Sequence, residues 1–330
     1  MFTIAMRSTV WVFAKRTYTR LPICKSGNGI INNVYDENTL VEQEVSLAVA
    51  MWNAWDLIVN LRGIGWIGPE KMRLPTPYFR VESRVTFFFL SVFRAIFFTT
   101  TFDMIALYVC SLGPDTFGTP KGGTIFDPSL PPLKRYTKSS IITLISSAAA
   151  YNVIETIYQV HAAFFTLVFQ QYPSQWPPLF DSPWLSTSIT SFWGQRWQQL
   201  FREYFVVVGS KPMQKYLGRV GTVLGGFAVS GVLHDVGMRG MNRGADTLEV
   251  VGFFFLQGVG VILEHAWRKA TGRRVEGVIG FLWVFFFFLV TGHIFVDVWA
   301  RRGLLGSDFI PKAYRPTTLF INWISQRGSL

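Results

Sequence analysis

The chain of 330 residues has little charge, little cysteine and little histidine. Lys, Arg, Asp and Glu make up 15% of it, whereas soluble domains carry about 25%. This shortage argues against an ordinary water-soluble enzyme. Cys24 and Cys110 form no spacing motif, so neither a disulfide framework nor a metal site is expected.

Short motifs that define several enzyme classes are also missing. The sequence contains no G-x-S-x-G elbow, no Walker phosphate loop, no dinucleotide-binding glycine pattern and no H-E-x-x-H zinc motif. Chemistry in this chain would therefore use acid and base groups acting on bound substrates, and no tightly bound cofactor is expected.

Long apolar runs dominate what is present: 50% of the residues are hydrophobic, including 31 Phe and 12 Trp. A helix needs about 20 apolar residues to cross a bilayer. Segment 46–61 is marginal for this length, and aromatic and polar residues alternate over 185–208, which predicts an interfacial segment that dips into the protein. The expected fold is an all-α, polytopic transmembrane helical bundle of about five to eight spans, and the predicted spans are 85–112, 141–169, 220–238, 248–267 and 278–299.

The net charge of +11 comes mostly from the loops between these runs. Basic loops facing anionic lipid are the favoured explanation, and a cradle for an anionic cosubstrate is the minor alternative. Nucleic-acid binding is not expected, because no readout motif is present. Lys and Arg occur in nearly every loop, so the sequence leaves the orientation in the membrane open. We expect a basic, interfacial N-terminal segment (1–44), a membrane domain (45–300) and a C-terminal tail (301–330).

Several of the predicted spans carry polar side chains that are costly at bilayer depth and therefore mark candidate sites. His234 follows Ser230 by one turn, on a helix whose glycines are spaced four residues apart for close helix contact. It is either a general base or a histidine bonded across helices for packing. Asn152, Glu155 and Gln159 form a stripe on another span that either lines a substrate cavity or bonds to neighbouring helices. For His293 and Asp297 we expect a direct hydrogen bond along one helix face.

Four segments, in order, resemble elements of one protein family. Residues 60–66 (NLRGIGW) are similar to an RGIGW element, and 175–180 (QWPPLF) to a WPPLF element. Residues 191–198 (SFWGQRWQ) are similar to an S-x-x-x-FWGRRWH block, and 227–234 (FAVSGVLH) to an F-x-x-SG-x-x-H helix. Together they resemble the fungal wax-synthase-like members of the membrane-bound O-acyltransferase class over roughly residues 45–300.

This resemblance implies acyl transfer from acyl-CoA to an alcohol. The fungal members imply acetyl-CoA as donor and a lipophilic secondary metabolite, such as a terpenoid or meroterpenoid, as acceptor in the endoplasmic-reticulum membrane. The family histidine corresponds to His234, our candidate general base, and Gln198 is the second candidate catalytic residue. The candidate substrate-binding residues come from two places. The family's tryptophan block contributes Trp193, Arg196 and Trp197, and the spans contribute Ser230, Asn152 and Glu155. The candidate CoA-binding cations are Arg202, Lys211 and Lys215.

One position departs from the family pattern, which places histidine where this chain has Gln198. Glutamine can hydrogen-bond a hydroxyl or a thioester carbonyl, but it does not accept a proton usefully. Two rival interpretations therefore stay open. One is a catalytically inactive family member acting as a scaffold, and the other is a membrane transporter that uses buried polar residues as a path.

Overall fold

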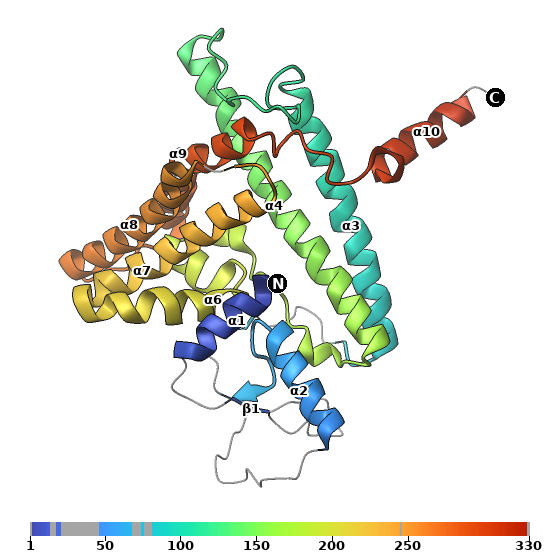
Figure 1. Ribbon diagram of the computed structural model, residues 1–330. Helices are drawn as coiled ribbons and strands as arrows, with labels where there is room; N and C mark the ends of the chain where they lie inside the picture. Colours follow the sequence, from blue (N-terminus) through green and yellow to red (C-terminus); the bar gives the residue numbers. More distant parts are fainter. Residues whose placement is uncertain are drawn as a thin grey trace.

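The computed structural model describes residues 2–13, 18–20, 46–67, 74–75, 81–244 and 246–328. Within these ranges the regular secondary structure is helical, apart from one short antiparallel pair of strands, β1 (Thr19–Arg20) with β2 (Trp66–Ile67). The prediction of an all-helical fold is confirmed. Figure 1 shows the arrangement, in which the longer helices are α1 (Phe2–Phe13), α2 (Leu47–Val59), α3 (Arg84–Ser111), α4 (Pro132–Val168), α7 (Lys211–Gly240), α8 (Thr247–Thr271), α9 (Gly277–Arg301) and α10 (Pro316–Gly328).

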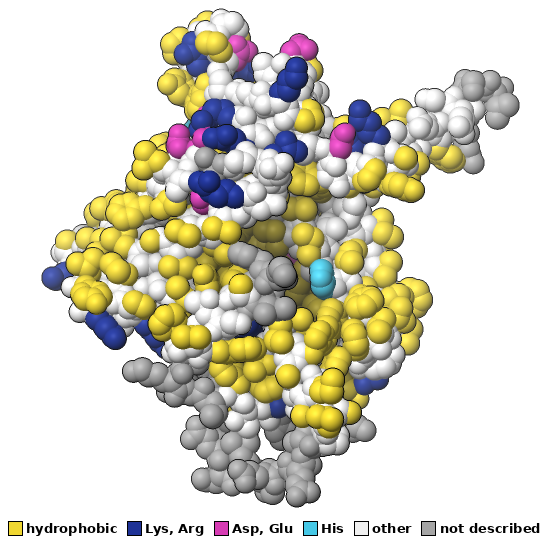
Figure 2. Space-filling view, in the orientation of Figure 1, with side chains coloured by type: hydrophobic (Ala, Val, Ile, Leu, Met, Phe, Trp, Pro, Cys, Tyr) yellow, Lys and Arg dark blue, Asp and Glu magenta, His cyan; other side chains and the backbone are white. Residues whose placement is uncertain are grey.

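Five described segments are long and apolar enough to cross a membrane: α3, α4, the stretch Arg202–Gly240, α8 and α9. They include all five predicted spans, so the polytopic membrane fold is confirmed. Helix α4 begins nine residues before the predicted span, at Pro132. Proline is favoured in the first helical turn because its missing N–H costs nothing there, and the polar residues that follow extend the helix beyond the apolar run. The face seen in Figure 2 is largely apolar along these helices, as a lipid-facing surface requires.

The stretch Arg202–Gly240 reverses direction at Gly218 rather than running straight through the membrane. Gly218 has φ 56° and ψ −135°, a conformation that few residues other than glycine adopt. Residues 205–217 and 219–240 pack side by side: a Cβ on Gly209 would strike the Gly225 backbone, and a Cβ on Gly225 would lie 2.8 Å from Met213 Cβ. We call this pair of arms the Gly218 hairpin (Figure 1). The small residues were predicted to allow close packing of a neighbouring helix. The neighbour is the other arm of the same segment.

Helix α8 lies at the centre of the α7–α9 group. Of its apolar window 44% is buried, against 22% for α3 and for α9. A Cβ on Gly231 of α7 would lie 2.9 Å from Val251 Cα, and a Cβ on Gly258 would lie 3.2 Å from the Phe227 ring. These contacts fix an antiparallel register in which the Gly218 turn lies near the C-terminal part of α8.

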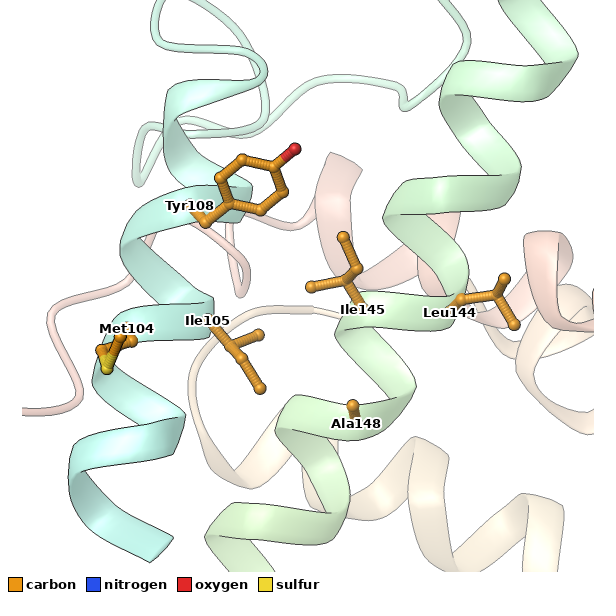
Figure 3. A pocket seen from close by; sticks show the side chains of 6 residues that line it. All are labelled: Met104, Ile105, Tyr108, Leu144, Ile145 and Ala148. Atoms are coloured by element: carbon orange, nitrogen blue, oxygen red, sulfur yellow. The ribbon is translucent and has the colours of Figure 1, made fainter. Parts of the chain in front are cut away.

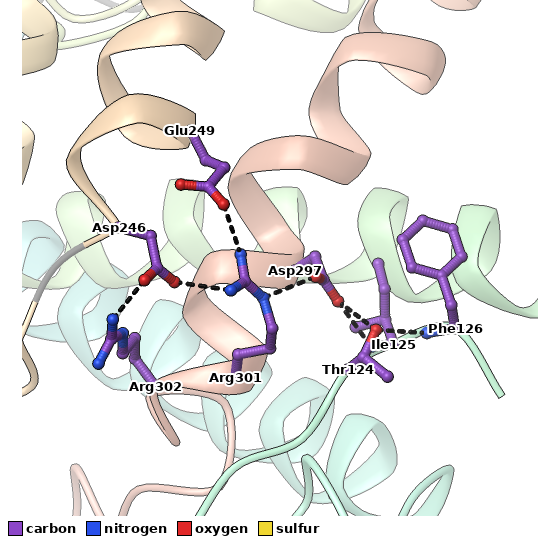
Figure 4. A network of polar contacts seen from close by, with 8 residues as sticks. All are labelled: Thr124, Ile125, Phe126, Asp246, Glu249, Asp297, Arg301 and Arg302. Atoms are coloured by element: carbon purple, nitrogen blue, oxygen red, sulfur yellow. Dashed lines mark hydrogen bonds and ion pairs between the residues drawn. The ribbon is translucent and has the colours of Figure 1, made fainter. Parts of the chain in front are cut away.

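At the opposite end of α7–α9, ion pairs join three loops (Figure 4). Arg301 bonds Asp297 and Asp246 at 2.9 Å each and Glu249 at 3.4 Å, and Arg302 also pairs with Asp246. The other carboxylate oxygen of Asp297 accepts from Thr124 Oγ1 at 2.7 Å and from the Ile125 backbone N–H at 2.9 Å. The network ties the loop before α4 to the α7–α8 turn and to the end of α9.

Helix α1 packs against α2 and α6 (Arg202–Tyr204), and its Arg7 is buried. Arg7 pairs with the buried carboxylate of Glu203 at 2.5 Å, and Tyr18 donates to the same carboxylate at 2.9 Å. The buried Arg7 side chain therefore has a counter-ion inside the protein. The predicted domain boundary at 44/45 and Cys24 lie outside the described residues, and the three-part division stays a prediction.

Candidate active site

His234 is half-buried on α7 among aromatic side chains of the two neighbouring helices. Its imidazole stacks on Phe254 of α8 with 4.3 Å between ring centroids, and it meets the Phe295 ring of α9 edge-on at 5.7 Å. The structure thus places the histidine in an aromatic cage lined by protein rather than against lipid.

The hydrogen bond that His234 makes determines which ring nitrogen can act as a base. Nδ1 lies 2.8 Å from the backbone carbonyl of Ser230. A carbonyl oxygen only accepts, so Nδ1 carries the proton in the neutral ring and Nε2 keeps its lone pair. No partner for Nε2 is recorded among the described residues. The backbone of Ser230, rather than its hydroxyl, orients the ring.

The tryptophan block reaches the same cage through Phe254. Trp193 lies on the π-helix η4 (Phe192–Arg196), and its ring is 6.2 Å from Phe254 and 6.0 Å from Phe227. Trp197 follows directly, 6.1 Å from Trp193 and stacked on Phe192 at 5.4 Å. The FWGQRWQ block and the histidine helix, predicted to act together, are therefore joined by one aromatic cluster.

Trp193 is held by a buried chain of polar side chains. Its indole N–H donates to Gln257 Oε1 at 3.3 Å, and Gln257 Nε2 donates to Thr291 Oγ1 at 3.0 Å. The Gln257 side chain is fully buried. A buried amide satisfied on both sides fixes one orientation, because a flipped amide would face its partners with the wrong groups.

Glu264 holds the start of the block in place. Its buried carboxylate accepts four hydrogen bonds, from the Ile189 and Thr190 backbone N–H groups at 2.6 and 2.9 Å, from Thr190 Oγ1 at 2.6 Å and from Trp283 Nε1 at 2.9 Å. Carboxylates favour helix N-termini, where N–H groups lack partners. Glu264 thereby anchors α5 (Ile189–Ser191), which leads directly into η4.

Gln198 is half-buried at the end of the block, and one half of its amide is engaged. Oε1 accepts from the Leu200 backbone N–H at 2.8 Å. Its Nε2 has no recorded partner within the described ranges, so two N–H donors remain for a ligand. Trp197, Trp193 and Phe254 lie between Gln198 and His234.

The three candidate CoA-binding cations and the candidate substrate-binding Arg196 fall into two kinds. The Arg196 guanidinium donates to the carbonyls of Asp181 and Ser182 at 2.9 and 3.1 Å, and Arg202 donates to Gln199 Oε1 at 3.1 Å. Both shape the block itself. Lys211 and Lys215 are exposed on the first arm of the Gly218 hairpin.

Arg62 joins the first two family-like elements. The buried guanidinium donates to the carbonyls of Pro178 and Pro177 at 3.0 and 2.9 Å and to the Tyr158 hydroxyl at 2.5 Å. Tyr158 in turn donates to the Pro177 carbonyl at 2.5 Å. Phe180, at the end of this WPPLF segment, packs edge-on to Trp197 at 4.9 Å. All four family-like segments therefore converge on one cluster.

The stripe on α4 is buried as expected. Gln159 donates to the Glu155 carboxylate at 3.1 Å, while Asn152 donates to the carbonyl of Ala148, one turn back, at 2.8 Å. The three side chains are 6–7% exposed, so they point into the protein interior. The structure gives no direct contact between this stripe and His234.

The predicted His293–Asp297 hydrogen bond is wrong. His293 Nε2 lies 3.3 Å from the hydroxyls of both Ser139 and Ser140, on α4. Asp297 turns instead toward Arg301 and the Thr124 loop (Figure 4). His293 thus has partners on α4, and Asp297 has partners in the Thr124 loop as well as at Arg301, and spacing within one helix does not indicate partners on other elements.

An apolar pocket of about 440 Å³ opens between α3 and α4. Figure 3 shows Ile105 and Tyr108 of α3 across from Ile145 of α4; Met104, Leu144 and Ala148 complete the lining. His234 lies on a different group of helices, α7–α9, so this pocket is separate from the histidine cage.

Sequence reasoning gave no role to the residues that hold the block. The sequence places Gln257 and Glu264 seven positions apart on one face of a spanning helix, which marks them as polar residues at bilayer depth but does not indicate their partners. Phe254 and Phe295 carry no such signal, since the chain contains 31 phenylalanines. Arg62 was visible only as part of the RGIGW resemblance.

The fold is that of an integral membrane protein, and an aromatic cluster surrounds His234 within it. Residues 176–256 match the family model described as "Membrane bound O-acyl transferase family". This segment contains the WPPLF element, the tryptophan block and His234, and the resemblance to that family is confirmed over it.

Relatives of two kinds match the chain. A long-chain-alcohol O-fatty-acyltransferase of Simmondsia chinensis is 32% identical over 138 residues, covering 38% of this chain and 39% of the relative. The acetyltransferase sirH of Emericella nidulans is 26% identical over 209 residues (60% and 45%), and the acetyltransferase atnC of Arthrinium sp is 28% identical over 137 residues (36% and 32%). The matches therefore span less than half the length of each of these three relatives.

Proposed function

We propose that this protein is a membrane-bound O-acyltransferase that moves an acyl group from acyl-CoA to the hydroxyl of a lipophilic alcohol. The favoured donor is acetyl-CoA and the favoured acceptor is a terpenoid-type secondary metabolite, in the endoplasmic-reticulum membrane. The observation that carries the proposal is His234, whose Nδ1 is engaged by a carbonyl and whose Nε2 is available, beside the tryptophan block.

His234 acts as the general base. Ester formation requires the acceptor hydroxyl to lose its proton as its oxygen attacks the thioester carbon. Nε2 takes that proton, and the Ser230 carbonyl stabilises the resulting imidazolium through Nδ1–H. The thiolate of CoA leaves and takes up the proton from His234 Nε2, which returns the imidazole to its neutral form. A positioned base of this kind contributes about 10²–10⁴-fold in rate.

Gln198 serves as a hydrogen-bond donor for the thioester oxygen. With Oε1 held by Leu200, its Nε2 group is oriented, and an oriented donor stabilises the negative charge that develops on that oxygen. Trp193 and Trp197 form the apolar wall beside it, which limits water and so hydrolysis of the thioester. Lys211 and Lys215, which are exposed, are the proposed contacts for the CoA phosphates, while Arg196 and Arg202 shape the block. Asn152, Glu155 and the Ser230 hydroxyl are kept as candidate acceptor contacts.

The test is acyl transfer by microsomes that contain the wild-type protein or His234→Ala at matched protein level. Labelled acetyl-CoA and a long-chain acyl-CoA are each offered with a panel of terpenoid alcohols and a long-chain alcohol, and esters are identified by mass. We expect acetyl esters from the wild type and a loss of about 10²-fold or more in His234→Ala. If esters form only from the long-chain donor, the proposed acyl transfer stands, but the donor is a long-chain acyl-CoA instead of acetyl-CoA.

His161→Ala is the matched control. His161 also lies on a spanning helix and also directs Nδ1 to the carbonyl one turn back, Ile157 O at 2.7 Å, but it is exposed. Its replacement should leave turnover unchanged. Equal activity in His234→Ala and wild type would remove His234 as the base. No ester from any donor and acceptor, with the protein folded, would contradict the proposed activity and favour a scaffold.

A further inference from the structure

The two ends of the α7–α9 group differ in how their cations are compensated. At one end lie the Gly218 turn and the turn between α8 and α9. Six cations there are exposed and have no ion-pair partner among the described residues: Lys215, Arg219, Arg268, Lys269, Arg273 and Arg274. We call this the cationic end. The carboxylate that accompanies them is Glu276, at the N-cap of α9.

At the other end, most of the arginines are paired with carboxylates, whereas Arg135 and Arg243 bond backbone carbonyls and Lys121 is exposed. Arg301 and Arg302 are paired within the network of Figure 4. Arg239 pairs with Asp235 at 3.0 Å, and Lys138 with Asp127 at 3.3 Å. On the face seen in Figure 2, acidic and basic side chains lie together over this upper part, whereas basic side chains stand alone at the left edge. We call this the paired end.

The antiparallel register places the six cations at one level. The Gly231–Val251 and Gly258–Phe227 contacts put Gly218 opposite the C-terminal part of α8, close to Arg268. Lys215 and Arg219 flank the Gly218 turn, and Arg273 and Arg274 lie between α8 and α9. These positions are far apart in the sequence, so the loop-by-loop distribution of Lys and Arg did not reveal the asymmetry.

We propose that the cationic end lies against the anionic cytosolic leaflet and that the paired end faces the opposite compartment. Uncompensated Lys and Arg favour the cytosolic side of a membrane, where anionic lipid attracts them, whereas a cation whose charge is cancelled by a neighbouring carboxylate gains little there. The partner of this surface is therefore the anionic bilayer face. This orientation goes beyond the proposed acyl transfer and does not depend on it.

The test is single-cysteine labelling in sealed microsomes, in full-length protein whose two native cysteines are replaced by serine. Arg273→Cys reports the cationic end. Lys121→Cys reports the paired end, because it adjoins Gly122, whose added Cβ would strike the backbone of Arg301; both positions are exposed. A membrane-impermeant maleimide is added before or after detergent, and a luminal marker protein checks that the vesicles are sealed.

We expect Arg273→Cys to be labelled in sealed vesicles and Lys121→Cys only after detergent. Each cation near an anionic surface favours that side by roughly fivefold, so the labelling ratio between the two positions should exceed that factor. The reverse pattern, or equal labelling of both positions in sealed vesicles, would overturn the proposal.

A second set of variants tests whether the charges themselves set the orientation. Replacing Arg268, Lys269 and Arg274 by Gln in the Lys121→Cys protein should make a fraction of that cysteine reachable without detergent. Replacing Lys134 and Lys312, exposed outside the cationic end, should leave it protected. An unchanged pattern in the first variant would contradict the role given to the cationic end.

Discussion

Glu264 Oε2 lies 2.6 Å from Thr190 Oγ1 and 2.9 Å from the Thr190 backbone nitrogen, so that one carboxylate oxygen of α8 receives both donors of a residue at the start of α5. Its other oxygen receives Ile189 and Trp283. The entry to the tryptophan block is therefore fixed by a buried side chain that needs no contact with substrate.

Glu264→Gln should destabilise the protein and lower its turnover. An amide replaces one carboxylate oxygen by an N–H₂ group, which would face two donors and leave them unsatisfied. Each unsatisfied buried group costs about 1–3 kcal/mol. We expect a lower melting temperature in detergent, measured by tryptophan fluorescence, together with reduced acyl transfer per folded molecule.

Glu276→Gln is the control for that substitution. Glu276 is exposed and makes no recorded side-chain hydrogen bond in the described part of the chain, so its replacement should change neither quantity. Equal melting temperatures for wild type and Glu264→Gln would show that the carboxylate is not needed to hold the block.

Arg62→Lys should separate the WPPLF segment from α4. Lysine presents a single nitrogen, whereas the guanidinium reaches Pro178, Pro177 and Tyr158 with two. We expect a loss of about 2–4 kcal/mol in stability, since buried acceptors lose charged donors. Tyr158→Phe, which removes one of the three acceptors, should lose less. Chemical denaturation in detergent orders the two variants, and an equal loss in both would contradict this account.

Gly218→Ala should strain the hairpin turn without a steric clash. An added Cβ meets nothing within 4 Å, so the cost comes from φ 56° and ψ −135° alone, and such conformations cost about 1–3 kcal/mol. Gly225→Ala should be worse, because its Cβ would strike the Gly209 backbone. Gly237→Ala is the control: this helical glycine has open space. The measurement is the melting temperature of the three variants, and a Gly218→Ala protein as stable as Gly237→Ala would argue against the reversal.

Membrane spans were predictable because their signal is local: twenty apolar residues suffice to identify a helix of spanning length. The reversal inside Arg202–Gly240 was not, since Gly218 is one of 29 glycines and its backbone angles depend on the packing of the two arms. The extension of α4 to Pro132 was missed for a related reason. Polar residues beyond the apolar run can remain helical outside the bilayer, and hydropathy gives no boundary for them.

At the candidate site, the sequence indicated residues but not their partners. His234 stood out as an ionisable group in an apolar run, and its cage contains the tryptophan block as expected. The roles of Gln257 and Glu264 depend on α8 meeting α5 and η4, which no spacing within one helix encodes. The failed His293–Asp297 pairing has the same origin, because His293 bonds serines of α4 and Asp297 bonds the Thr124 loop.

The ion network at the paired end predicts a specific dependence of stability on pH. The Arg302 hydrogen bond, opposed by partial burial and aided by the charges of Arg301 and Arg302, lowers the pKa of Asp246 below its ordinary value. A carboxyl group with a lowered pKa in the folded state contributes stability above its unfolded pKa of about 3.9, and that stability is lost as the pH falls through the folded pKa. Wild type should therefore melt above Asp246→Asn by a constant margin between about pH 5 and 8, and the margin should shrink below about pH 4. A margin that does not change on acidification would mean that the charge of Asp246 contributes nothing to holding the loops together.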